Sequence, residues 1–145
     1  MVDFLSPRER SNRMSLIRGR DTQPELALRR ALHRLGLRFR LHGAGLPGKP
    51  DLVFPRYKTV VFVHGCFWHQ HAGCSIATIP KSNTQFWVEK FKKNIDRDKR
   101  VSAQLNELGW KVLVAWECEL STRQKIELTG KRIAIEIKSQ ILQID

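Results

Sequence analysis

Two periods of hydrophobic residues run along the chain, and each predicts a different kind of element. Helical spacing predicts helices over residues 22–35, about 85–108, and 123–141, and glycines follow the first two directly. The apolar residues that define their buried sides are Leu28, Ala31, Leu32 and Leu35 in the first helix and Phe91, Ile95, Leu105 and Leu108 in the second. Shorter apolar runs predict strands over residues 38–41, 50–54, 59–63 and 111–116.

The second and third predicted strands are separated by only four residues and therefore predict a hairpin. If Phe54 pairs with Thr59, Asp51 lies opposite Phe62, and His64 becomes a diagonal neighbour of Asp51 at about 7–8 Å. Because a shift of one residue would reverse the faces of the strand, this register is what brings Asp51 and His64 to the same end of the hairpin.

The order helix, hairpin, helix, strand, helix predicts an α/β fold with a mixed central sheet flanked by helices. A length of 145 residues suits a single domain, residues 1–145. Within it, residues 1–20 are predicted to form a basic arm or short helix, and residues 121–145 to contain the closing helix.

Composition indicates the cellular compartment of the protein. No apolar run approaches the roughly 20 residues that a membrane-spanning helix needs, and the N-terminus lacks the pattern of a secretory signal. Three cysteines, an odd number, argue against a disulfide framework. The sequence therefore predicts a protein of the reducing cytoplasm without a membrane partner.

The charge of the chain indicates a polyanionic partner. The formal net charge is +12, and residues 1–49 hold eleven Lys and Arg against four Asp and Glu. Ten of these eleven are arginines, which suit phosphate groups and narrow minor grooves. We therefore expect the basic residues to bind nucleic acid; the alternative is that they form a surface that is only solvated.

Residues 61–74 concentrate the candidate chemistry. The spacing Cys66-x4-His71-x2-Cys74 places three soft or borderline ligands in one loop, and the remaining cysteine, Cys118, follows a buried strand. Zinc takes four such ligands in a tetrahedron, so the set predicts a closed structural zinc site. The alternative is that these residues are ordinary buried thiols, which pack as small hydrophobic groups.

Two histidines of this stretch, His64 and His69, remain outside the predicted zinc site and are candidates for proton transfer. Two acids face inward on their predicted helices. Glu25 either completes a capping box by accepting from the Thr22 amide or belongs to a site. Asp98 either orients one of the histidines or pairs with a neighbouring arginine, Arg97 or Arg100.

Glu25, Asp51 and His64 together have the layout of a divalent-metal nuclease site, in which a hard carboxylate holds Mg²⁺ beside a phosphate. The arrangement Pro50-Asp51 … Phe62-Val63-His64 resembles the PD-(D/E)xK (restriction-endonuclease-like) nuclease fold. Val63 and His64 stand where that fold usually has its second acid and its lysine.

Four motifs resemble the very short patch repair (Vsr) endonuclease family more closely still. They are Leu46-Pro47-Gly48-Lys49-Pro50-Asp51, Phe62-x-His64-Gly65-Cys66-Phe67-Trp68-His69, Phe86-Trp87-x-Glu89-Lys90 and Trp110-x-Val112-Leu113-x-x-Trp116-Glu117-Cys118. The resemblance implies a Mg²⁺-dependent enzyme that nicks the thymine strand of double-stranded DNA 5′ to a T·G mismatch. It further implies a monomer in the prokaryotic, nucleoid-containing cytoplasm that works with mismatch-repair proteins and a companion cytosine-5 methyltransferase.

Position by position, the resemblance implies a role for each site residue. Mg²⁺ would be held by Asp51 and the main chain of Val63, with Glu25 as a supporting acid. His69, held by Asp98, would be the base, and His64 would lie beside the scissile phosphate. Cys66, His71, Cys74 and Cys118 would bind zinc. Phe67, Trp68 and Trp87 would insert between DNA bases; the alternative for these three aromatic residues is packing in the core.

Val63 departs from the pattern, because the family commonly has a hydroxyl residue there.

Two other functions compete with the nuclease hypothesis. One is a non-catalytic, zinc-stabilised DNA-binding module. The other is a zinc hydrolase that uses His64, His69 and His71 at an open metal position.

Overall fold

The computed structural model describes residues 21–139, so the predicted N-terminal arm and Ile141 lie outside the described residues. Its helices are α2 (Gln23–Arg34), α3 (Thr84–Glu107) and α4 (Arg123–Lys138), and its strands are β1 (Arg40–Leu41), β2 (Leu52–Phe54), β3 (Thr59–His64) and β4 (Lys111–Trp116). Short 3₁₀ turns, Pro55–Tyr57 and Glu117–Leu120, follow β2 and β4. No helix of this part of the chain is long and apolar enough to cross a membrane.

The four strands form one mixed sheet in the order β1-β2-β3-β4. Phe54 pairs with Thr59 across the antiparallel β2–β3 hairpin, which confirms the predicted register. β4 lies parallel to β3, and His64 pairs with Trp116 at the end of this pair. The register therefore brings the end of β3, the start of β2 and the end of β4 to one edge of the sheet.

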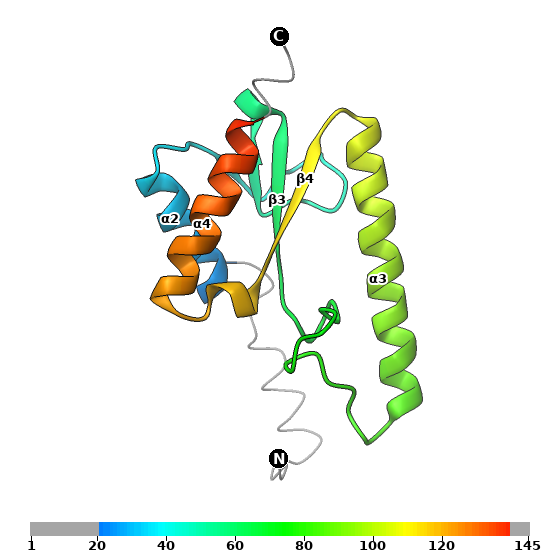
Figure 1. The fold of residues 1–145 in the computed structure, drawn as a ribbon. Coiled ribbons are helices and arrows are strands. Elements are labelled where there is room, and N and C mark those ends of the chain that lie inside the picture. Colours follow the sequence, from blue (N-terminus) through cyan, green and yellow to red (C-terminus); the bar gives the residue numbers. More distant parts are fainter. Residues whose placement is uncertain (1–20, 140–145) are drawn as a thin grey trace.

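Helices cover both faces of the sheet, α2 and α4 on one side and α3 on the other (Figure 1). Alternate residues of the hairpin accordingly enter two different cores. Phe54 and Val61 pack with Leu28, Leu32 and Ile133 of α2 and α4. The second core is formed by Val53, Val60 and Leu105, with Val101 and Trp110 packed against it. Burial on both faces explains why these strands read as continuous apolar runs.

Two details of the predicted elements are wrong. Leu35 and Leu108, expected on the buried sides of their helices, are the C-caps of α2 and α3 and are 36% and 56% exposed. β1 contains only Arg40 and Leu41, and Leu41 is 44% exposed on this edge strand. Phe39, just before β1, instead packs edge-on against Phe54, with ring centroids 5.6 Å apart.

Candidate active site and metal centre

The five predicted catalytic residues line one open cavity of about 680 Å³. Asp51 enters from the start of β2, His64 from the end of β3, Glu25 from α2, His69 from the following loop and Asp98 from α3. Further lining residues are His42, Leu46, Gly48, Lys49, Phe62, Val63, Arg97 and Val101. Residues separated by up to 73 positions, 98 minus 25, therefore meet at the edge where the strands end.

Asp51 is fixed by the hairpin. Its Oδ2 accepts a hydrogen bond from the Val63 amide at 2.7 Å, and its carbonyl accepts one from the His42 amide at 3.1 Å. The pKa of Asp51 is raised to about 6, mainly by burial and in addition by the Glu25 carboxylate, against the lowering effect of the hydrogen bond from Val63. Two carboxylates are thus held near each other in a partly desolvated cavity, an arrangement that a divalent cation would stabilise.

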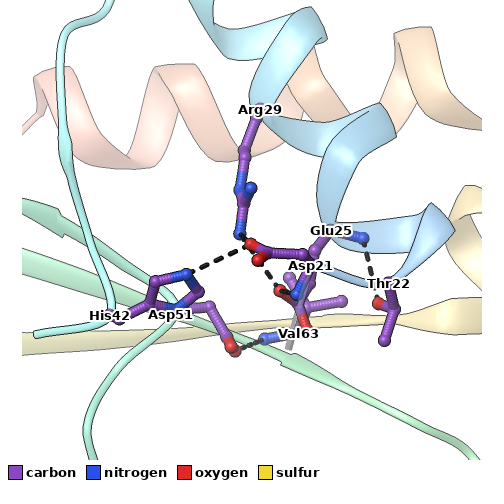
Figure 2. A network of polar contacts seen from close by, with 7 residues as sticks. All are labelled: Asp21, Thr22, Glu25, Arg29, His42, Asp51 and Val63. Carbon is purple, nitrogen blue, oxygen red and sulfur yellow. Dashed lines mark hydrogen bonds and ion pairs between the residues drawn. The ribbon is translucent and has the colours of Figure 1, made fainter. Parts of the chain in front are cut away.

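Glu25 is buried at the first turn of α2, where Thr22 Oγ1 accepts from the Glu25 amide at 3.5 Å (Figure 2). The predicted capping-box partner is wrong. Glu25 Oε2 accepts from the Asp21 amide at 2.8 Å and from Arg29 at 3.2 Å, instead of from the Thr22 amide. The Glu25 carboxylate therefore serves the helix end and lines the cavity at the same time.

Sequence reasoning missed the network behind Glu25, which Figure 2 shows. Arg29 Nη2 lies 2.7 Å from Asp21 Oδ1, and His42 Nε2 lies 3.1 Å from the same oxygen. Arg29 could have been found, because it follows Glu25 by one helical turn. Asp21 and His42 have left-handed φ values of 58° and 52°, and no local pattern in the sequence marks their meeting.

His64 and His69 stack face to face, with ring centroids 3.9 Å apart and planes 4° apart. His69 Nδ1 lies 2.6 Å from Asp98 Oδ2, so the predicted contact between Asp98 and one of the two histidines is present. Within residues 21–139, Asp98 makes this contact rather than an ion pair with Arg97 or Arg100. Burial, followed by the neighbouring His69, lowers the pKa of His64 to about 4, so its imidazole is neutral at neutral pH.

The four predicted zinc ligands converge. One ligand atom from each of Cys66, His71, Cys74 and Cys118 lies within 4.8 Å of the others, and the three thiols are free. His71 Nδ1 is 3.6 Å from Cys66 Sγ and 3.4 Å from Cys118 Sγ. Tetrahedral zinc, with bonds of about 2.3 Å to sulfur and 2.05 Å to nitrogen, would separate such atoms by about 3.6 Å. The donor set and its spacing therefore fit a closed metal site.

His71 belongs to the cysteine cluster, whereas His64 and His69 form a separate group with Asp98, so the three histidines do not share one metal position as the zinc-hydrolase hypothesis requires. The cluster also joins two segments of the chain. Cys118 lies in the 3₁₀ turn after β4, and Glu117 Oε1 accepts from the Cys66 amide at 2.8 Å. A cation held there would tie the end of β4 to the loop that carries His69.

Phe67, Trp68 and Trp87 form an aromatic group together with Phe91. Ring centroids in this group lie 5.1–6.0 Å apart, mostly edge to face. Only Phe91 is buried, at 3% exposure, whereas the other three are half-buried. The three predicted DNA-contacting rings therefore sit on an anchored but partly open surface, intermediate between a core and a free wedge.

Comparison with known proteins decides the family. The family model described as "DNA mismatch endonuclease Vsr" matches residues 2–75, just over half of the chain. The chain belongs to the Vsr family. It is 46% identical over 126 residues to the DNA mismatch endonuclease Vsr of Escherichia coli, covering 87% of this chain and 80% of that protein.

Further Vsr-like relatives are named type II nicking enzymes. The chain is 50% identical over 133 residues to V.XorIIP of Xanthomonas oryzae, covering 92% of this chain and 97% of the relative. It is 43% identical over 141 residues to V.NmeAIP of Neisseria meningitidis, covering 97% of this chain and 100% of the relative. The resemblance noted in the sequence is confirmed, and the protein is a DNA endonuclease rather than a non-catalytic DNA-binding module.

Proposed function

We propose that this enzyme is a Mg²⁺-dependent mismatch endonuclease that nicks the thymine strand of double-stranded DNA 5′ to a T·G mismatch. In this proposal the nick begins very short patch repair of deaminated 5-methylcytosine. The observation that carries the proposal is the convergence of Glu25, Asp51, His64 and the His69–Asp98 pair on one cavity. The E. coli relative at 46% identity carries the name mismatch endonuclease, which supports the same substrate class.

Asp51 and the main-chain carbonyl of Val63 are the proposed Mg²⁺ ligands. A buried carboxylate next to a second acid is suited to hold a hard cation, and Mg²⁺ typically binds proteins through one or two carboxylates while substrate phosphate supplies further oxygens. When bound, Mg²⁺ supplies Lewis-acid charge to the phosphate and favours the ionised form of Asp51. The Arg29 and Asp21 contacts hold Glu25 as a supporting acid facing the cavity.

His69 is the proposed general base or water-orienting group. Its Nδ1 is engaged by Asp98, so its Nε2 is the nitrogen left for a proton in the cavity, as in other histidines oriented by a carboxylate. His64, buried and neutral, is proposed to lie beside the scissile phosphate, where a neutral imidazole can donate a hydrogen bond to an oxygen. Electrostatic help of this kind is strongest in a partly desolvated site.

The Cys66, His71, Cys74 and Cys118 cluster is the proposed structural zinc site, which fixes the loop that carries His69. Phe67, Trp68 and Trp87 are proposed to enter the base stack beside the mismatch. Unstacking costs a few kcal/mol per step and is least costly where pairing is already weak, so insertion selects for mismatched sites. The net charge of +12 supports binding to the phosphate backbone.

The context of the enzyme is also proposed. We assign the mixed sheet and its edge site to the PD-(D/E)xK superfamily and treat the chain as a single nuclease domain that acts as a monomer. Its expected partners are mismatch-repair proteins and a companion cytosine-5 methyltransferase. The expected location is the nucleoid-containing cytoplasm of a prokaryote.

The test is a panel of duplexes that each contain a single mismatch, incubated with Mg²⁺ or with EDTA. We expect nicking of T·G duplexes on the thymine strand, with Mg²⁺ only. Asp51→Ala should abolish nicking and keep duplex binding measurable, whereas Asp96→Ala, an exposed acid of α3, should nick like the wild type. Full activity of Asp51→Ala, or equal nicking of perfect duplexes, would overturn the proposal.

A further inference from the structure

Trp116 lies between the two clusters of histidines. Its ring stacks on His71 of the cysteine cluster, with centroids 4.1 Å apart and planes 7° apart. It also meets His64 edge to face, at 5.2 Å and 75°. A single indole therefore contacts both a predicted zinc ligand and a predicted catalytic imidazole.

The backbone fixes Trp116 in this place. It is the last residue of β4 and pairs in parallel register with His64, the last residue of β3. Its amide donates to Glu119 Oε1 at 3.0 Å, and Cys118 follows two residues later. The indole is thus anchored by the sheet on one side and by the cysteine cluster on the other.

From His64 the contacts continue to the proposed base. His64 stacks on His69 at 3.9 Å, and His69 bonds to Asp98 at 2.6 Å. The order of contacts is therefore His71, Trp116, His64, His69 and Asp98. It runs from the cysteine cluster to α3 without a break.

Core packing does not account for Trp116. The indole is half-buried and belongs to neither hydrophobic core of residues 21–139. It lines a second cavity, of about 570 Å³, which lies against His64, His69 and Asp98 and is also lined by Ile95 and Val114. Trp116 therefore lines this second cavity beside the two stacked histidines, and its edge contact with His64 supports the stack on that side.

We propose that Trp116 is a positioning residue, which sets the orientation of the His64–His69 stack and couples it to the geometry of the Cys66, His71, Cys74 and Cys118 cluster. The inference rests on the proposed function of His64 and His69 in nicking. An aromatic contact of this kind is worth about 0.5–1.5 kcal/mol. Its larger effect is geometric, because a misplacement of about 1 Å in a catalytic group can cost about 100-fold in rate.

The experiment compares Trp116→Leu and Trp116→Phe in the full chain, with Trp110→Phe as a matched control. Trp110 precedes β4 and packs on the second core, far along the strand from the histidines. For Trp116→Leu we expect the single-turnover nicking rate on a T·G duplex to fall by about 10–100-fold. Its zinc content should stay at wild-type level and its duplex Kd should change less than about threefold. Trp116→Phe should retain most of the wild-type rate, because an aromatic ring remains at this position.

A second readout does not depend on nicking. Loss of Trp116 should shift the ring-proton NMR signals of both His64 and His71 and broaden the low-field signal of the His69 Nδ1–H that faces Asp98. Trp110→Phe should leave these signals in place. If the wild type nicks no duplex but the histidine signals still change when Trp116 is replaced, the proposed function is wrong and the coupling between Trp116 and the histidines is supported.

Three results would overturn the inference. The first is a wild-type rate and unchanged histidine signals in Trp116→Leu. The second is a loss of rate that only follows a loss of zinc or of duplex binding. The third is an equal loss of rate in Trp110→Phe at matched thermal stability, which would show a general effect of weakened packing.

Discussion

The Asp51 carboxylate accepts its hydrogen bond from the main-chain amide of Val63, at 2.7 Å across the β2–β3 hairpin. Val63, where the sequence resemblance leads us to expect a hydroxyl residue, therefore contacts Asp51 through its backbone. The identity of the side chain at residue 63 should then matter little, because any residue other than proline presents the same amide and carbonyl.

Val63→Thr tests this reasoning. We expect its nicking rate and its dependence on Mg²⁺ concentration to stay within about threefold of the wild type. Both quantities can be read from single-turnover nicking of a T·G duplex across a Mg²⁺ titration. A gain of tenfold or more, about 1.4 kcal/mol in transition-state stabilisation, would mean that a hydroxyl at residue 63 takes part directly.

Asp51→Asn should stabilise the metal-free protein above pH 6. The pKa of Asp51 is raised to about 6 from 3.8, so between about pH 4 and pH 6 the unfolded chain releases this proton before the folded protein does. The free energy of unfolding therefore falls as the pH rises through this window and levels off above it. At 1.36 kcal/mol per pKa unit, the full loss is at most about 3 kcal/mol.

His64 has the opposite slope, which is why the variant must be compared with the wild type at each pH. The pKa of His64 is lowered to about 4 from 6.5, so its contribution to the free energy of unfolding rises between about pH 4 and pH 6.5. Urea unfolding in EDTA should give equal stabilities for wild type and Asp51→Asn near pH 4 and a more stable variant at pH 8. A variant that is less stable than the wild type at pH 8 would contradict the burial argument.

The sequence was sufficient where a local period or a spacing carried the information. The hairpin register followed from the position of the turn between Phe54 and Thr59, and the register alone brought Asp51 and His64 to one cavity. The cysteine cluster followed from ligand spacing because three of its members lie in one loop. In both cases the residues that interact are close in sequence, so the short segment between them allows few other arrangements.

Tertiary contacts explain what could not be predicted. Asp21 and His42 meet only because two backbone positions adopt left-handed conformations in separate loops. Glu25 exchanges its expected partner for the Asp21 amide because Arg29 draws both acids together. Leu108 continues the helical period but is the exposed C-cap of α3, so periodicity alone cannot distinguish it from a core residue.

Asp98→Asn should reduce nicking without changing DNA binding. The amide can keep a hydrogen bond to His69 but cannot stabilise a positive charge there, so we expect a loss of about 10–100-fold in single-turnover rate. Asp96→Asn is the matched control, since Asp96 is exposed on the same helix two residues earlier. An equal loss in both variants would attribute the effect to the charge of α3 and not to the His69 contact.

Removal of the metal from the cysteine cluster should abolish nicking in a way that Mg²⁺ cannot repair. We expect one zinc per chain, and a Cys74→Ser variant that retains less zinc, melts several degrees lower and does not nick at any Mg²⁺ concentration. Ser75→Ala, at the exposed neighbouring residue, should behave as the wild type. Wild-type activity in a zinc-free Cys74→Ser protein would rule out the structural role.

Trp87→Ala should weaken the distinction between mismatched and perfect DNA more than it weakens binding to DNA in general. Trp87 is half-buried against Phe67 and Trp68, so truncation removes one side of the aromatic group while buried Phe91 keeps its base in place. If the group enters the base stack, the Kd for a T·G duplex should rise about 5- to 150-fold, which corresponds to a loss of about 1–3 kcal/mol in binding free energy. The Kd for the perfect duplex, which depends on phosphate contacts, should change little. Competition binding at one fixed salt concentration measures both values, with Val88→Ala, an exposed neighbour on α3, as the control. An equal rise in both Kd values would assign Trp87 to packing of the loop instead of to recognition of the mismatch.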